Sequence, residues 1–188
     1  MTNNTESAPL SDSPLKEVKR SRGHAFVDYI ISRCKSDNGV QAALKRADNP
    51  ATEYQSWDVL ATFGVNLEHE NQRIPHATIA AAIARAKLDK NGATGIGWAI
   101  AKCYEDGNTS EQAKAKLRRL LACDNITEVC RILRPLFSLV ESKSTIGLNY
   151  AMLLDDLLWF GHEDSQVRIK ARWAMDFYRK SVTGEHHE

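Results

Sequence analysis

Basic residues in the C-terminal half of this 188-residue chain recur at helical spacing. Three segments each carry a pair of cations three or four residues apart: Lys114 with Arg118, Arg131 with Arg134, and Arg168 with Arg172. On a helix, residues at this spacing project from the same face. Guanidinium and ammonium groups neutralise phosphates and release counterions, which gives affinity without reading bases. These residues therefore indicate binding to a phosphate backbone.

Further cations extend this set. Arg119 and Lys170 lie beside the pairs, and Lys45-Arg46 ends a short apolar segment near the N-terminus. Two other interpretations stay open, because a basic last turn complements a helix dipole and a cation can simply be solvated or meet an acid such as Asp176. The predicted phosphate-binding residues are Lys45, Arg46, Lys114, Arg118, Arg119, Arg131, Arg134, Arg168, Lys170 and Arg172.

The net charge of +1 does not by itself indicate a polyanion partner, so the hypothesis rests on how charge is distributed. Residues 112–134 contain six cations and two acids, and residues 165–180 contain five cations and one acid. Phosphate binding then requires that cations from separate helices form one continuous track. Cations scattered over opposite sides, or neutralised by carboxylates, would contradict it.

One acidic cluster could be read as a hydrolytic metal site. It comprises Asp155, Asp156, His162, Glu163 and Asp164. The two aspartates are predicted on a helix exterior and the other three in the following turn, where Asp164 suits a helix cap, so the cluster does not converge on one ion. The glycines at 92, 95 and 97 lack the strand and the Lys of a phosphate loop. We predict no catalytic residue, no metal and no cofactor.

The cysteines and the tryptophans have structural interpretations. Cys34, Cys103, Cys123 and Cys130 form no CxxC pair and no signal peptide precedes them, which favours reduced thiols in a cytoplasmic protein. No apolar run approaches the roughly 20 residues that span a bilayer. The four tryptophans could stack on bases, but Trp57, Trp98, Trp159 and Trp173 all adjoin apolar stripes, which favours core packing.

The pattern of apolar residues predicts an all-α helical bundle protein. Residues 148–178 form a helical hairpin with the turn at 161–165. The apolar stripe predicted for its second helix, widened by Trp173 and Phe177, contains Val167, Ala171, Ala174, Met175 and Tyr178. Pro75 suits a first helical turn, and Thr109 with Gln112 and Asn125 with Glu128 have capping-box spacing. The predicted organisation is a loose tail at 1–22, an N-terminal helical part at 23–106, a C-terminal bundle at 107–181 and a flexible tail at 182–188.

Five segments occur in a telling order: Gly39-Val-Gln-Ala-Ala-Leu-Lys45-Arg46 with Pro50, Ile96-Gly-Trp-Ala-Ile-Ala101, Leu117-Arg-Arg-Leu-Leu-Ala-Cys-Asp124, Leu153-Leu-Asp-Asp-Leu-Leu-Trp-Phe160 and Arg172-Trp-Ala-Met-Asp-Phe-Tyr178. Together they resemble the CasB family, the small subunit of the type I-E CRISPR Cascade surveillance complex. The resemblance covers about residues 23–178. Trp98 and Ala122 stand where some relatives carry arginine.

This resemblance implies a non-catalytic, all-helical subunit, present as two copies beside backbone and large subunits, CRISPR RNA and target DNA. It implies that basic side chains hold the guide–target hybrid and the displaced DNA strand. Lys45, Arg46, Arg118, Arg119 and Arg134 match basic family positions, and Arg168 and Arg172 lie in the basic last helix. Two alternatives are a purely structural helical adaptor and a metal-dependent nuclease that uses Asp155, Asp156 and His162.

Overall fold

The computed structural model describes residues 21–143 and 146–179. The predicted tails therefore lie outside the described residues, apart from residues 21 and 22. Within the described ranges the regular elements are helical, and the one extended pairing is a bridge between Thr94 and Leu148. The all-α prediction is confirmed. The elements are α1 (Arg22–Ser36), α2 (Asn38–Leu44), η1 (Glu53–Ser56), α3 (Trp57–Thr62), α4 (Glu70–Ala86), α5 (Ile96–Lys102), η2 (Gly107–Thr109), α6 (Glu111–Leu121), α7 (Ile126–Glu141), α8 (Tyr150–Trp159) and α9 (Glu163–Tyr178).

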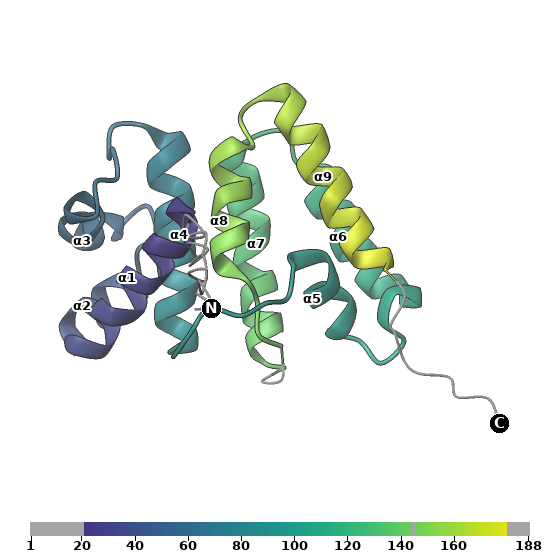
Figure 1. Cartoon of the computed structure of the whole chain (residues 1–188), viewed down its shortest axis with the longest axis horizontal. Coiled ribbons are helices and arrows are strands. Elements are labelled where there is room, and N and C mark those ends of the chain that lie inside the picture. The colour runs from purple at the N-terminus through teal and green to yellow at the C-terminus, as the bar shows by residue number, and fades with distance from the viewer. Residues whose placement is uncertain (1–20, 144–145, 180–188) are drawn as a thin grey trace, which may run out of the picture.

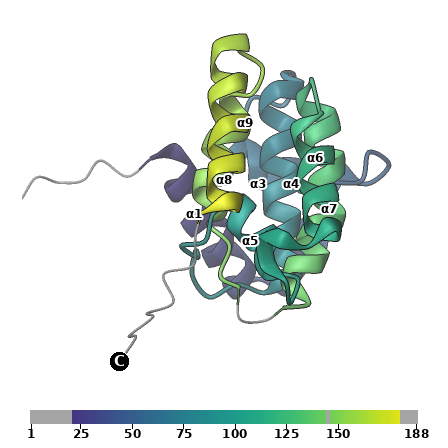
Figure 2. The same ribbon diagram turned by 90° about the vertical axis from the view of Figure 1, so that its right-hand side faces the viewer.

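The helices α4, α7 and α8 form the middle of the molecule (Figure 1). Helices α1, α2 and α3 lie at one end, where α1 packs on both α8 and α4. Helices α5, α6 and α9 lie at the other end, and α5 contacts both of the others (Figure 2). A continuous apolar core runs through both ends, with Phe26 and Trp173 among its largest fully buried side chains. The end of α2, which Lys45 and Arg46 follow, and the basic helix α6 are thereby placed at opposite ends of the long axis (Figure 1).

Helix starts follow local capping chemistry. The Asn125 side chain accepts a hydrogen bond from the Glu128 amide at 2.9 Å, as its spacing predicted. Glu128 reaches back to the amide of Asp124 rather than to that of Asn125. The predicted cap Thr109 is wrong, because Ser110 accepts from the Ala113 amide and α6 begins one residue later. Capping boxes thus located both helices to within one residue.

Pro75 does not begin a helix. Helix α4 starts at Glu70 and contains Pro75 in its second turn, buried with the alanine-rich segment that follows. A proline within a helix removes one backbone hydrogen bond, and burial of the surrounding apolar side chains offsets that loss. The prediction placed the start too late because the first turn, Glu70–Arg73, carries no apolar signal.

The inner face of α9 differs from the predicted stripe. Ile169, Trp173 and Phe177 are buried, whereas Val167, Met175 and Tyr178 are exposed by 69%, 75% and 53%. Both sets repeat at helical spacing, so periodicity alone did not distinguish them. The buried set contains the larger aromatic surface and therefore gains more from burial. The exposed residues, which we call the outer ridge of α9, form an apolar face without a cover in the described part of the chain.

Gly97 decides how closely α5 approaches α9. A methyl group built on Gly97 would collide with the carbonyl oxygen of Trp173 and the backbone nitrogen of Phe177. Backbone atoms on both sides leave no flexible side chain that could move away, so any side chain here must push the two helices apart. We predict that Gly97→Ala lowers the free energy of unfolding by about 2 kcal/mol, measured by urea denaturation.

The matched control for this prediction is Gly161→Ala. Gly161 is exposed in the turn between α8 and α9, and a methyl group there meets only ordinary contacts, the nearest at 3.5 Å. Equal stability losses in the two variants would show that close packing of α5 on α9 is not the reason for glycine at 97.

Candidate nucleic-acid interface

Most of the predicted phosphate-binding cations have carboxylate neighbours. Six of the ten lie within ion-pairing distance of an acid: Lys114, Arg118, Arg131, Arg134, Lys170 and Arg172. Several of these pairs are exposed, and exposed pairs stabilise a fold by only about 0–1 kcal/mol, so they exchange readily for a phosphate. Lys45, Arg46, Arg119 and Arg168 have no carboxylate partner among the described residues.

Asp48 joins the N-terminal basic residues to α7. Its carboxylate accepts hydrogen bonds from Arg85 at 2.6 and 3.1 Å and lies 3.7 Å from Nε of Arg134. Arg85 also donates to the backbone carbonyl of Lys45 at 2.9 Å. The end of α2 and the basic face of α7 therefore lie together, as a phosphate track requires. Sequence reasoning missed Asp48 and Arg85, because nothing in their spacing marks a bidentate pair 37 residues apart.

A hollow of about 350 Å³ opens beside this junction. Arg131 and Arg134 of α7 line it together with Arg73, Asp48 and Glu53. Nε of Arg73 lies 3.3 Å from Glu53, and Nε of Arg134 is buried without a hydrogen-bond acceptor. Glu70 also lines the hollow, so three arginines face three acids. The hollow is therefore balanced in charge and is not a basic groove.

The cations of α6 lie at the other end of the molecule. Glu111 in its first turn contacts both Lys114, at 2.8 Å, and Arg118, at 3.8 Å. The hydrogen bond from Lys114 holds the pKa of Glu111 below its usual range, so this acid stays charged and offsets both cations. Arg119, on the exposed side of the same helix, has no side-chain partner in the described ranges. Arg119 is therefore less compensated than Lys114 and Arg118.

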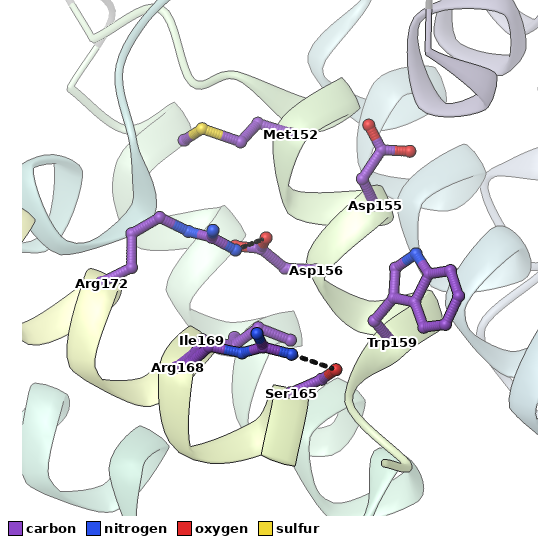
Figure 3. A pocket seen from close by; sticks show the side chains of 8 residues that line it. All are labelled: Met152, Asp155, Asp156, Trp159, Ser165, Arg168, Ile169 and Arg172. Carbon is purple, nitrogen blue, oxygen red and sulfur yellow. Dashed lines mark hydrogen bonds and ion pairs between the residues drawn. The ribbon is translucent and has the colours of Figure 1, made fainter. Parts of the chain in front are cut away.

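The three predicted cations of α9 project in two directions. Lys170 lies 3.5 Å from Asp124 and 5.7 Å from the ring centre of Phe160, on the side toward α6. Arg168 and Arg172 lie on the other flank and line a hollow between α8 and α9 (Figure 3). The structure places the end of α2 beside α7, and it places Lys170 beside the connection between α6 and α7. It does not gather all ten cations into one place, so the prediction of one continuous track is wrong, and phosphate contacts would fall in separate patches.

Asp156 is buried, contrary to the predicted helix exterior. Its side chain accepts a hydrogen bond from Nη2 of Arg172 (Figure 3). It accepts a second, at 2.7 Å, from the indole nitrogen of Trp173. Burial raises the pKa of this carboxyl, and the two donors oppose that effect. The prediction was wrong because the apolar stripe of α8 could not show that α9 also packs against the side of α8 that carries Asp156. Asp155 accepts from the Gly23 amide at 3.0 Å and so caps α1.

The remaining members of the acidic cluster surround the start of α9. His162 is its N-cap residue but makes no side-chain cap, and Glu163 and Asp164 occupy the first turn, where negative charge favours the helix dipole. The predicted cap role of Asp164 is therefore wrong. Among the described residues, no group of three or more His, Cys, Asp or Glu converges to hold a metal ion.

The tryptophans divide between core and surface. Trp173 is buried, and Trp98 is half-buried beneath Arg179 at 4.6 Å from its ring centre. Trp57 is 38% exposed and Trp159 is 60% exposed, so core packing was the wrong prediction for these two. Trp159 is the last residue of α8, where the apolar stripe continues in sequence but no helix of the described ranges covers it. The apolar pattern of α8 could not show where the neighbouring helices stop covering it.

The four cysteines are free and buried, as predicted for thiols without disulfides. Burial raises the pKa of each thiol, to about 12 for Cys130, so all four stay protonated and weakly reactive. Across residues 21–143 and 146–179, no helix combines the length and the apolar character needed to cross a membrane.

Comparison with known proteins places this arrangement in context. The family model for the CRISPR-associated protein Cse2 matches residues 40–178. The crystal structure of TTHB189, a CRISPR-associated Cse2-family protein from Thermus thermophilus, matches this fold with a TM-score of 0.67. The two sequences are 23% identical, and the match covers 83% of this chain and 97% of that chain. CasB from M. ruber is 26% identical, with a TM-score of 0.67 over 86% and 94%. These matches confirm the resemblance that the five sequence segments indicated.

A chain in the structure of a CRISPR RNA-guided surveillance complex also has this fold. It is 20% identical, with a TM-score of 0.64, and the match covers 84% of this chain and 92% of that chain. None of the curated proteins matches this chain.

Proposed function

Because this chain belongs to the CRISPR-associated Cse2 family, we propose that it is a non-catalytic subunit of a CRISPR RNA-guided surveillance complex in antiviral defence. The observation that supports this most directly is the match of 92% of a chain from such a complex to the fold described above. Its partners would be backbone and large subunits, CRISPR RNA, target DNA and a second copy of itself. Co-purification of the tagged chain with a small RNA and several larger proteins tests this membership, and purification of the chain alone from its native cells would contradict it.

We further propose that the cationic residues hold phosphates of the guide–target hybrid and of the displaced DNA strand. Base pairing with the guide supplies sequence specificity, so the protein needs only contacts that ignore sequence. Opening a DNA duplex against a guide RNA is close to balanced in free energy, and a few protein–phosphate contacts therefore shift it. The cations without a carboxylate partner among the described residues support this role as separate local contacts: Lys45, Arg46, Arg119 and Arg168.

The exposed pair Arg118 and Arg119 gives the cleanest test of phosphate contact. For Arg118→Gln with Arg119→Gln, we expect a shorter-lived open DNA loop in the complex and a salt dependence of binding that is flatter by about 1.4, since each lost contact to a single strand removes about 0.7. The matched control is Lys87→Gln with Lys90→Gln, which removes the same charge from exposed positions outside the predicted set. Equal slopes for both double variants would reject the α6 contacts.

A purely structural adaptor is the second candidate, because six cations have acidic neighbours and the outer ridge of α9 is uncovered and apolar. An adaptor would tolerate loss of Arg118 and Arg119. It would leave the complex when Met175, at the centre of the ridge, is changed to aspartate. Phosphate binding instead predicts that loss of Arg118 and Arg119 shortens the lifetime of the open loop, whereas Met175→Asp leaves that lifetime unchanged.

A further inference from the structure

We propose that the hollow between α8 and α9 binds one unpaired nucleotide of a single strand, with its base stacked on Trp159 and its phosphate held by Arg168. The proposal deepens the proposed function, on which it rests for the presence of a displaced strand. The hollow measures about 490 Å³, within the range of about 300–1,000 Å³ usual for ligand sites. Trp159 lines it from α8, and Arg168 and Arg172 line it from α9 (Figure 3).

Trp159 presents unusual aromatic surface for a soluble domain. Its side chain is 60% exposed, and it lines a second hollow, of about 640 Å³, formed with the turn at 161–165. Arg168 lines both hollows. The ring centre of His162 lies 5.4 Å from the indole at an angle of 43°, so this neighbour is tilted rather than stacked. Space therefore adjoins the indole, and the same cation lies beside that space in both hollows.

Arg168 makes no ion pair within the described residues, although the acids Glu163 and Asp164 line the second hollow with it. Asp156 is satisfied by Arg172 and Trp173, and Asp155 accepts from the first turn of α1, at the positive end of that helix dipole. Arg168 itself donates only to neutral acceptors, from Nε to the Asp164 carbonyl at 3.1 Å and from Nη2 to the Ser165 hydroxyl at 3.4 Å. These two bonds orient the guanidinium and leave other donors free, since arginine has five N–H groups.

A nucleotide matches both features at once. Any base can stack on an exposed indole, and the phosphate next to it needs a nearby guanidinium with free donors. An apolar protein segment would cover Trp159 but leave the Arg168 charge without a partner. The outer ridge of α9 is the better surface for such a segment, because it is apolar along its length. The exposed indole and the unpaired guanidinium beside it therefore favour single-stranded nucleic acid.

The test measures binding and light-induced crosslinking, at low salt, of the full chain to a thymidylate strand of about 20 nucleotides that carries 5-iododeoxyuridine. We expect light-induced crosslinking to Trp159, and a loss of affinity of about five- to 150-fold in Trp159→Ala, with binding largely kept in Trp159→Phe. Arg168→Gln should flatten the salt dependence by about 0.7. The matched control Trp57→Ala removes an exposed tryptophan from α3, at the other end of the molecule (Figure 1), and should bind like the unchanged chain.

Three results would overturn the proposal. Absence of strand binding or of a Trp159 crosslink is the first, and equal affinities of Trp159→Ala and Trp57→Ala are the second. If Trp159 crosslinks to another protein subunit within the purified complex, the hollow is a protein contact and the nucleotide site is rejected. None of these outcomes removes the proposed function, which depends separately on co-purification and on the α6 variants.

Discussion

Asp156→Ala should lower the free energy of unfolding by about 3 kcal/mol, because this substitution removes the acceptor at the centre of the α8–α9 contact. The indole N–H of Trp173 is buried and would lose its partner, which costs about 1–3 kcal/mol. Arg172 would also lose its carboxylate, but its side chain is 53% exposed and returns to water, so its share is small. Urea denaturation at neutral pH measures the sum.

Asp156→Asn separates the hydrogen bond from the charge. The amide oxygen keeps an acceptor for Trp173, and the buried negative charge is gone, so we expect a smaller loss than with alanine. A loss as large in Asn as in Ala would show that the ion pair with Arg172, and not the bond from Trp173, holds the contact together.

The pH dependence of stability, compared between the native chain and Asp156→Asn, gives a second test of the role of Asp156. Burial raises the pKa of Asp156 in the folded chain, so the folded state binds a proton more readily than the unfolded state between the ordinary carboxyl pKa of 3.8 and the raised value. Stability from this group is therefore present at low pH and declines as pH rises through that window. As pH rises through that window, the unfolding free energy of the native chain should therefore fall relative to that of Asp156→Asn.

Residues 148–178 show how far sequence periodicity reaches. The spacing of apolar residues located both helices of the hairpin and the turn between them, since amphipathic helices must bury one stripe. It did not select the inner face of α9, because two overlapping stripes were available. The choice is made by Gly97, which lets α5 approach the backbone of α9 near Trp173 and Phe177. Such a contact joins segments far apart in the chain and leaves no mark on local spacing.

The candidate site was limited in the same way. Spacing identified cations that share a helix face, and the structure keeps those faces largely accessible. Their acidic neighbours from other helices, such as Asp48 for Arg134 and Asp124 for Lys170, depend on tertiary packing. Exposure of Trp159 depends equally on where the neighbouring helices end. Residue types were therefore predictable, whereas pairing and cover were not.

His76 should make the chain sensitive to mild acid. Its side chain is fully buried against Phe26, with ring centres 4.7 Å apart, and Nδ1 lies 2.6 Å from the Gln72 carbonyl oxygen. Burial, opposed by that hydrogen bond and aided by Arg22, lowers the pKa of His76 from 6.5 to about 4. The unfolded chain thus binds more protons between these values, and stability is lost as pH falls from about 6.5 toward 4. At about 1.36 kcal/mol per pKa unit, the loss is about 3 kcal/mol.

The variant His76→Phe tests this assignment, because it keeps an aromatic ring of similar size and removes the titrating group. The substitution leaves few polar groups unpaired. Nε2 of His76 has no hydrogen-bond partner among the described residues. The Gln72 carbonyl, which loses Nδ1, lies one helical turn before residue 76 and can still accept from its backbone N–H. Urea denaturation at about pH 7 and about pH 4 should show a clearly smaller acid loss in His76→Phe than in the native chain. The exposed His69, changed to Gln, should leave the acid loss unchanged. If His76→Phe loses as much stability in acid as the native chain, protonation of the buried imidazole is not what weakens the fold.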